Sequence, residues 1–286
     1  MIAFRTLAAL GSRVGESPVW DDRRGVLFVC DVLVPTIHRV ALDGTVVASW
    51  SFDRTVGSFG LAESGRLVVA LGRDIVLFDP ESGSVNAFAC TPEPGTNRLN
   101  DGKVGPDGRF YIGSMDDRPE KEPLGVLYRV SADGSVEPVA TGFKVSNGLA
   151  WSPDGRLLYH SDSRGPTIDC YDFDPESGAL SGKRRFATLN EATGRPDGGA
   201  CDAEGFYWSA GVSAGVLNRF SPDGTLVSRH PVPARAPTMP CFCGPGLGLL
   251  AVTSLNLGSE SRNGDGDLFI AEAPAAGAAI ARMKGV

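Results

Sequence analysis

One short pattern recurs along the chain: a polar residue stands eight positions before a glycine that closes a tight turn. It is clearest in the segments NDGKVGPDG (100–108), NGLAWSPDG (147–155) and DGGACDAEG (197–205). Followed through the whole chain, the pattern has spacings of 43, 41, 47, 50 and 42 residues, with landmarks at Glu16, Phe59, Asn100, Asn147, Asp197 and Met239. A period of this length indicates six copies of one supersecondary unit.

Each unit contains short apolar runs separated by turn signals. The runs, such as 26–29 and 67–70, are too short and too often interrupted by glycine for helices. The turns include the Pro-Asp-Gly sequences at 106–108, 153–155 and 222–224, where we interpret Asp107, Asp154 and Asp223 as turn formers. About four short strands in each unit predict an all-β protein, a six-bladed β-propeller.

The two chain ends are expected to close this ring. Residues 2–8 form an apolar run with no hairpin partner, and we expect them to complete the last blade beside residues 268–270, which removes an open sheet edge. A closed ring has no internal boundary, so residues 1–286 are expected to form a single domain. The alanine-rich segment 273–279 is expected to be loosely ordered.

Composition excludes several classes of partner. The net charge of −7, without a Lys/Arg stripe, argues against nucleic acid, and no segment approaches the roughly 18 apolar residues of a membrane helix. Six cysteines without a C-x-x-C pair indicate reduced, packed thiols. We therefore expect a cytoplasmic protein without a membrane partner, either a monomer or a weak homo-oligomer.

The repeated landmark also predicts a site. In a propeller the innermost strands line the central channel, so Glu16, Asn100, Asn147 and Asp197 would face one another at its mouth, with Phe59 and Met239 as an apolar wall. Two carboxylates about 5 Å apart repel by roughly 3 kcal/mol at an effective dielectric constant near 20, which calls for a cation between them. Oxygen ligands favour calcium, magnesium or manganese, whereas zinc would normally call for histidine or cysteine.

Four motifs give the chain a family resemblance. The segments GESPVWD (15–21), NRLNDGK (97–103), SNGLAWSPDG (146–155) and PDGG (196–199) resemble, in the same order, those of the regucalcin, gluconolactonase and luciferin-regenerating enzyme family. The resemblance extends from about residue 12 to 271. Ser17 departs from it, because many relatives have glycine there, and Cys243 departs from the family's usual Cys-Phe-Gly-Gly.

The resemblance implies a residue set for the site. One divalent cation would be held by Glu16, Asn147 and Asp197, with calcium expected first and zinc, manganese or magnesium as alternatives. Arg98 and Asn100 would contact the hydroxyls of a sugar lactone. An acidic residue of the loop 116–122 would assist, for which Asp117 is the candidate and Asp116 and Glu120 remain open.

The expected function is therefore hydrolysis of a sugar (aldono-) lactone to its acid by a metal-dependent enzyme of carbohydrate metabolism. Asp197 would take the proton of the attacking water as general base. Two alternatives stay open. The same propeller and cation could serve a phosphotriesterase or another esterase, or the protein could be a calcium-binding or interaction propeller without catalysis.

Overall fold

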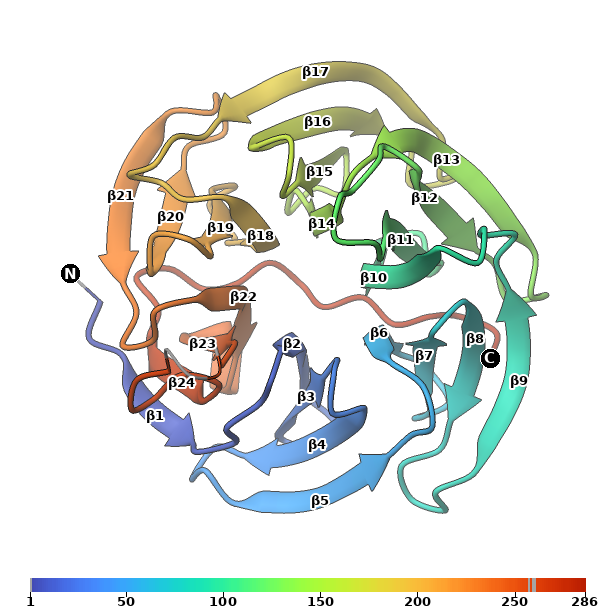
Figure 1. The fold of residues 1–286 in the computed structure, drawn as a ribbon, viewed down its shortest axis with the longest axis horizontal. Coiled ribbons are helices and arrows are strands. Elements are labelled where there is room, and N and C mark those ends of the chain that lie inside the picture. Colours follow the sequence, from blue (N-terminus) through green and yellow to red (C-terminus); the bar gives the residue numbers. More distant parts are fainter. Residues whose placement is uncertain (1, 257, 259–260) are drawn as a thin grey trace.

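The computed structural model describes residues 2–256, 258 and 261–286, and it is a six-bladed β-propeller, as the repeat predicts (Figure 1). Each blade is a four-stranded antiparallel sheet whose first strand lies nearest the central channel. Blade 1 consists of β2 (Gly15–Asp21), β3 (Val26–Asp31), β4 (Thr36–Ala41) and β5 (Val46–Ser51). Blade 2 consists of β6 (Val56–Leu61), β7 (Leu67–Leu71), β8 (Asp74–Phe78) and β9 (Val85–Cys90).

The next three blades repeat this meander. Blade 3 consists of β10 (Asn97–Val104), β11 (Phe110–Asp116), β12 (Gly125–Val130) and β13 (Val136–Phe143). Blade 4 consists of β14 (Ser146–Trp151), β15 (Leu157–Asp162), β16 (Thr167–Phe173) and β17 (Leu180–Thr188). Blade 5 consists of β18 (Pro196–Cys201), β19 (Tyr207–Gly211), β20 (Val216–Phe220) and β21 (Leu226–Pro231).

Blade 6 joins the two ends of the chain. It contains β22 (Pro237–Cys243), β23 (Leu249–Ser254) and β24 (Leu268–Glu272), with the short 3-10 helix η1 (Pro245–Leu247) between the first two strands. Its outermost strand is β1 (Arg5–Ala8), which pairs antiparallel with β24. The N-terminal strand thus covers the edge that β24 would otherwise expose.

The core lies between neighbouring blades. Middle strands such as β3 and β7 are buried along their whole length because they are covered on both faces, whereas the outer strands β5 and β21 are largely exposed. One apolar cluster joins blades 1 and 2 around Phe28, Phe59 and Phe78. These inter-blade layers fix the inner strands around the channel.

The hairpin turns follow the sequence-based interpretation. In each Pro-Asp-Gly turn the aspartate accepts a backbone hydrogen bond from the residue two positions later, at 3.1 Å for Asp107, Asp154 and Asp223. The following glycine at position 155 has a φ of 68°, a conformation that L side chains rarely adopt. These three aspartates therefore shape turns.

The segment that follows β24 is more ordered than its composition suggests. Residues 273–286 run across one end of the channel as a strap, visible in red in Figure 1. Its backbone donates hydrogen bonds from Ala278 to the Cys201 carbonyl (3.0 Å) and from Met283 to the Leu61 carbonyl (2.7 Å). The expectation of a loose alanine-rich tail is wrong, because contacts with distant blades hold it.

All six cysteines are free thiols, five of them buried. In the described part of the chain, no helix is long and apolar enough to cross a membrane.

Candidate active site

The innermost strands all depart from regular pairing near one end of the channel. Each of the six shows a shift of register with its neighbour, for example between Glu16 and Val19 in β2 and between Asn147 and Ala150 in β14. Such bulges re-aim side chains locally. In β2 the bulge places Ser17 at a φ of 49°, a conformation that L side chains rarely adopt.

The three clearest landmarks meet, as the spacing predicts. The Asn100 side-chain amide donates to Oδ1 of Asn147 at 3.2 Å, and the Asn147 amide donates to Oδ1 of Asp197 at 2.6 Å. A second hydrogen bond, 2.8 Å from the Asn147 amide to the Ser163 hydroxyl, fixes the buried Asn147 side chain. Blades 3, 4 and 5 are thereby joined at the channel mouth.

Glu16 faces this group from blade 1. One of its carboxylate oxygens accepts the backbone N–H of Ser17 at 3.1 Å. Burial raises the pKa of Glu16 well above its ordinary value, and the negative charges of Asp197 and Asp101 raise it further. The pKa of Asp197 is raised in the same way, by burial and then by the charge of Asp101. Glu16 and Asp197 are therefore two carboxylates that repel each other in a desolvated site.

Arg98 and Asn100 form one unit beside the carboxylates. The Arg98 guanidinium donates to Oδ1 of Asn100 at 2.8 Å and to Oδ1 of Asp117 at 3.1 Å, and its side chain is only 15% exposed. Burial lowers the pKa of Arg98, while the charges of Asp117 and Glu16 oppose that shift. The loop acid that belongs to this unit is thus Asp117.

The other acids of the 116–122 loop have different positions. Asp116 is buried and accepts hydrogen bonds from Arg118 (2.8 Å) and from the backbone N–H of Glu122 (2.9 Å), which folds the loop. Glu120 is exposed. Asp116 therefore organises the loop.

The landmark of blade 2 is not Phe59. The hairpin turns that follow the inner strands begin at positions 62, 105, 152 and 202, and counting back five positions gives Gly57, Asn100, Asn147 and Asp197. Phe59 is buried and packs edge-on against Phe28, with ring centroids 6.5 Å apart. Blade 2 thus contributes a glycine to the mouth. In blade 6, Met239 is buried and packs directly against Gly198, next to Asp197.

The repeated sequence pattern does not predict two charged residues of the channel, Asp101 and Lys103. Asp101 is 3% exposed, accepts the Leu149 backbone N–H at 3.1 Å through Oδ2, and leaves Oδ1 without a partner among the described residues. Lys103 donates across the channel to the Gly199 carbonyl at 2.7 Å. Burial raises the pKa of Asp101, and the positive charge of Lys103 opposes this shift. The Lys103 ammonium therefore stabilises the negative charge of Asp101 from inside the channel. Neither the Asp101-Gly102 pair nor Lys103 belongs to the repeated sequence pattern.

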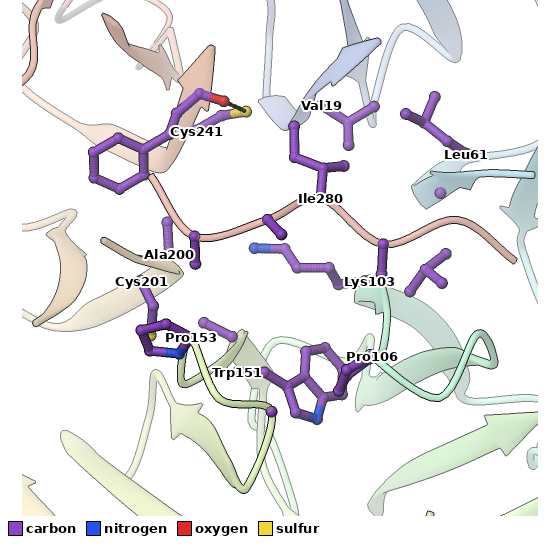
Figure 2. A pocket seen from close by; sticks show the side chains of 18 of the residues that line it. Val19, Leu61, Lys103, Pro106, Trp151, Pro153, Ala200, Cys201, Cys241 and Ile280 are labelled. Atoms are coloured by element: carbon purple, nitrogen blue, oxygen red, sulfur yellow. Dashed lines mark hydrogen bonds between the residues drawn. The ribbon is translucent and has the colours of Figure 1, made fainter. Parts of the chain in front are cut away.

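A cavity lies at the other end of the channel. It has a volume of about 380 Å³, and it is lined by the later residues of the inner strands, including Val19, Ala150 and Cys241, and by strap residues 278–281. Figure 2 shows Ile280 of the strap over this space and Lys103 reaching into it. Of the residues predicted at the mouth, Phe59 and Met239 line it and none of the polar ones does. The polar group at the mouth is therefore separate from this cavity.

The donor atoms at the mouth fit a hard divalent cation. One oxygen each of Glu16 and Asp197 has no hydrogen-bond partner in the described structure, and Asn147 offers an amide oxygen beside them. Carboxylate and amide oxygens are the ligands that calcium prefers. Among the described residues, no three His, Cys, Asp or Glu side chains cluster closely enough to hold an ion by themselves.

Comparison with known proteins gives a consistent result. The family model described as "SMP-30/Gluconolactonase/LRE-like region" matches residues 14–256. A 6-deoxy-6-sulfogluconolactonase of Pseudomonas putida is 38% identical over 85% of this chain and 84% of its own. An L-arabinolactonase of Azospirillum brasilense is 31% identical over 98% and 95%. The crystal structure of a calcium-binding regucalcin from Agrobacterium tumefaciens superposes with a TM-score of 0.93 at 25% identity, over 99% of this chain and 98% of that one.

Proposed function

Since the chain belongs to the SMP-30/gluconolactonase/LRE-like family, we propose that it is a sugar lactonase that opens an aldonolactone at the mouth of its channel. The observation that carries the proposal is the hydrogen-bonded chain Asn100–Asn147–Asp197, with Glu16 opposite and Arg98 beside it. The names of two relatives support the reaction class, because both are lactonases of sugar acids.

Asp197 is the residue that we propose as general base. Its Oδ1 is held by the Asn147 amide at 2.6 Å, which fixes the carboxylate in place to accept a proton from water. Attack by this water on the ring carbonyl would give the tetrahedral intermediate. It would collapse by breaking the ring C–O bond, and the departing alkoxide would take up the proton that Asp197 accepted from the water.

Arg98 and Asn100 would orient the sugar. The Arg98 guanidinium is held by Asp117 and Asn100, which leaves its Nη2 without a partner in the described residues. A fixed guanidinium offers directional hydrogen bonds to ring hydroxyls, and correct orientation of a bound reactant contributes strongly to rate.

A divalent cation would complete the site. Glu16, Asn147 and Asp197 would hold it, and when bound it would supply Lewis-acid stabilisation of the negative charge that develops on the carbonyl oxygen. Calcium is our first candidate, since the set contains only oxygens and the structurally similar regucalcin from Agrobacterium tumefaciens is a calcium-binding protein.

The test is hydrolysis of a panel of aldonolactones, followed as acid release. Asp197→Asn keeps the acceptor for Asn147 but removes the base, so we expect the turnover rate to fall by roughly two orders of magnitude or more. Asp223→Asn, in a hairpin turn, serves as the matched control. Turnover close to wild type in Asp197→Asn would contradict the role given to Asp197, and no hydrolysis of any lactone by the wild-type protein would contradict the proposed function.

A further inference from the structure

A buried pair of polar side chains immediately precedes Arg98 in the chain. Glu93 and Asn97 are each 5% exposed, and the Asn97 side-chain amide donates to Oε2 of Glu93 at 2.5 Å. The backbone N–H of Asn97 also donates to the Pro94 carbonyl at 3.0 Å. These two hydrogen bonds brace the turn 93–97 at the start of β10. Because side chains alternate along a strand, Asn97 lies on the buried face of β10 and Arg98 on the other.

The same asparagine holds the loop that carries Asp117. Residues 117–124 join β11 to β12, and both ends of this loop are tied to the braced turn. At its start the backbone N–H of Asp117 donates to the Thr96 carbonyl at 2.8 Å. At its end the Leu124 carbonyl accepts a hydrogen bond of 3.2 Å from the Asn97 side-chain amide. The position of the loop therefore depends on Asn97 at both ends.

Arg98 depends in turn on this loop. Its Nη1 donates to the Leu99 carbonyl at 3.0 Å and to Oδ1 of Asn100 at 2.8 Å, and both partners belong to β10 itself. Its Nε donates to Oδ1 of Asp117 at 3.1 Å, which fixes the guanidinium from a second element. The Asp117 side chain is 57% exposed, so the loop backbone, more than packing, holds its carboxylate in place.

We propose that Asn97 is a positioning residue for Arg98, acting through the turn 93–97 and the loop 117–124. The inference rests on the proposed function, in which Arg98 orients the sugar. An ion pair with an exposed carboxylate contributes little unless its geometry is held, and Asn97 supplies that constraint. Without the Asn97 amide, Asp117 moves with the released loop, and Arg98 keeps partners on its own strand alone. The guanidinium then loses the fixed orientation that directional binding of hydroxyls requires.

The direct test is nuclear magnetic resonance of the protein with isotope-labelled arginine. The Nε–H signal of Arg98 is assigned by its loss in Arg98→Ala, and its exchange with water reports the hydrogen bond to Asp117. In Asn97→Ala we expect this exchange to be at least about tenfold faster than in wild type. The Nε–H of Arg219, which donates to Asp202 at 3.1 Å in blade 5, should keep its wild-type rate. An unchanged Arg98 rate would overturn the inference.

Steady-state kinetics test whether Asn97 acts through Arg98. For a lactone that the wild type hydrolyses, Asn97→Ala should raise KM at least about threefold with a smaller change in kcat. In the Arg98→Ala background the same substitution should leave KM unchanged. Equal increases in KM with and without Arg98 would mean that Asn97 acts independently of it, which also overturns the inference.

Tyr111→Phe is the matched control for these rates. It removes another buried hydrogen bond of blade 3, from the Tyr111 hydroxyl to Asp107 at 2.9 Å, in the turn at the other end of the inner hairpin. It should keep the wild-type KM and the wild-type exchange rate of Arg98. A rise in KM as large as that of Asn97→Ala would show that a general loss of stability causes the effect, and would overturn the inference.

A second variant covers a failure of Asn97→Ala to fold, since that substitution leaves the buried Glu93 carboxylate without its amide donor. Glu93→Gln/Asn97→Ala removes this charge but still lacks the brace, so Arg98 should again exchange faster. If the wild type hydrolyses no lactone, the proposed function is wrong and the Arg98 exchange rate still decides the inference. Faster exchange in either Asn97 variant supports it, and wild-type exchange overturns it.

Discussion

His160 provides a prediction whose size follows from the structure. Its ring is 1% exposed, packs 4.2 Å from the Phe143 ring centroid, and bonds through Nε2 to the Ser146 hydroxyl at 2.7 Å. Burial lowers its pKa to about 4, despite the opposing charges of Asp162 and Asp169. The unfolded chain, with an ordinary histidine pKa near about 6.5, therefore binds more protons than the folded protein between these two values.

The sign and the magnitude follow from this difference. The stabilisation is present in full above about pH 6.5 and is lost as the pH falls toward about 4, because protonation then favours the unfolded chain. At about 1.4 kcal/mol per pH unit, the loss should be about 2 kcal/mol at pH 5 and about 3 kcal/mol at pH 4.

The assay is urea unfolding of wild type and His160→Gln at pH 7.5 and pH 5. The glutamine can still hydrogen-bond Ser146 but does not titrate, so the difference between the two proteins isolates His160 from the many carboxylates. We expect the wild-type free energy of unfolding to fall by about 2 kcal/mol more than that of the variant. Equal losses in both proteins would refute the reasoning.

Two other variants test the channel mouth. Arg98→Ala should raise KM by about tenfold while kcat changes less, if the guanidinium binds substrate and transition state alike; an unchanged KM would place Arg98 outside the substrate site. Gly57→Ala should destabilise the protein by about 1–3 kcal/mol in denaturant unfolding, because the new methyl would lie 2.6 Å from the Leu99 carbonyl oxygen. Wild-type stability in that variant would mean that β6 and β10 can separate freely.

Sequence spacing was sufficient to predict the positions of residues that lie at a fixed distance from a regular turn. Asn100, Asn147 and Asp197 keep a constant distance from the glycine of the following hairpin, and the structure brings them into hydrogen-bond contact. The same period predicted six blades. Local turn chemistry sets both features, so they are readable from single segments.

The sequence-based prediction was wrong for blade 2, where the strand register depends on pairing with the neighbouring strand. Ser58-Phe59-Gly60-Leu61-Ala62 matches the apolar sequence that begins at Ser146, but the turn of blade 2 comes sooner after it, so the equivalent residue is Gly57. Only the turn hydrogen bonds reveal this shift. Asp101 was missed for a related reason, because the bulge between Leu99 and Gly102 disrupts the alternation expected of a strand.

Long-range contacts explain why the C-terminal strap was wrongly predicted to be loosely ordered. The strap has the composition of a loose tail, yet Gly277 donates to the Leu247 carbonyl at 3.0 Å and Lys284 to the Gly108 carbonyl at 3.0 Å. Arg282 adds a 2.7 Å ion pair with the buried Asp21. Partners so distant in sequence leave no periodic signal in the segment itself.

The central claim is that oxygens of Glu16, Asn147 and Asp197 hold one divalent cation on which lactone hydrolysis depends. The most direct measurement is the initial rate of hydrolysis after chelator treatment, with calcium, magnesium, manganese or zinc then added back singly to wild type and to Glu16→Gln. We expect chelation to abolish turnover and one cation to restore it in wild type, with a higher concentration required in Glu16→Gln. Full turnover by the chelated, metal-free protein would contradict the account.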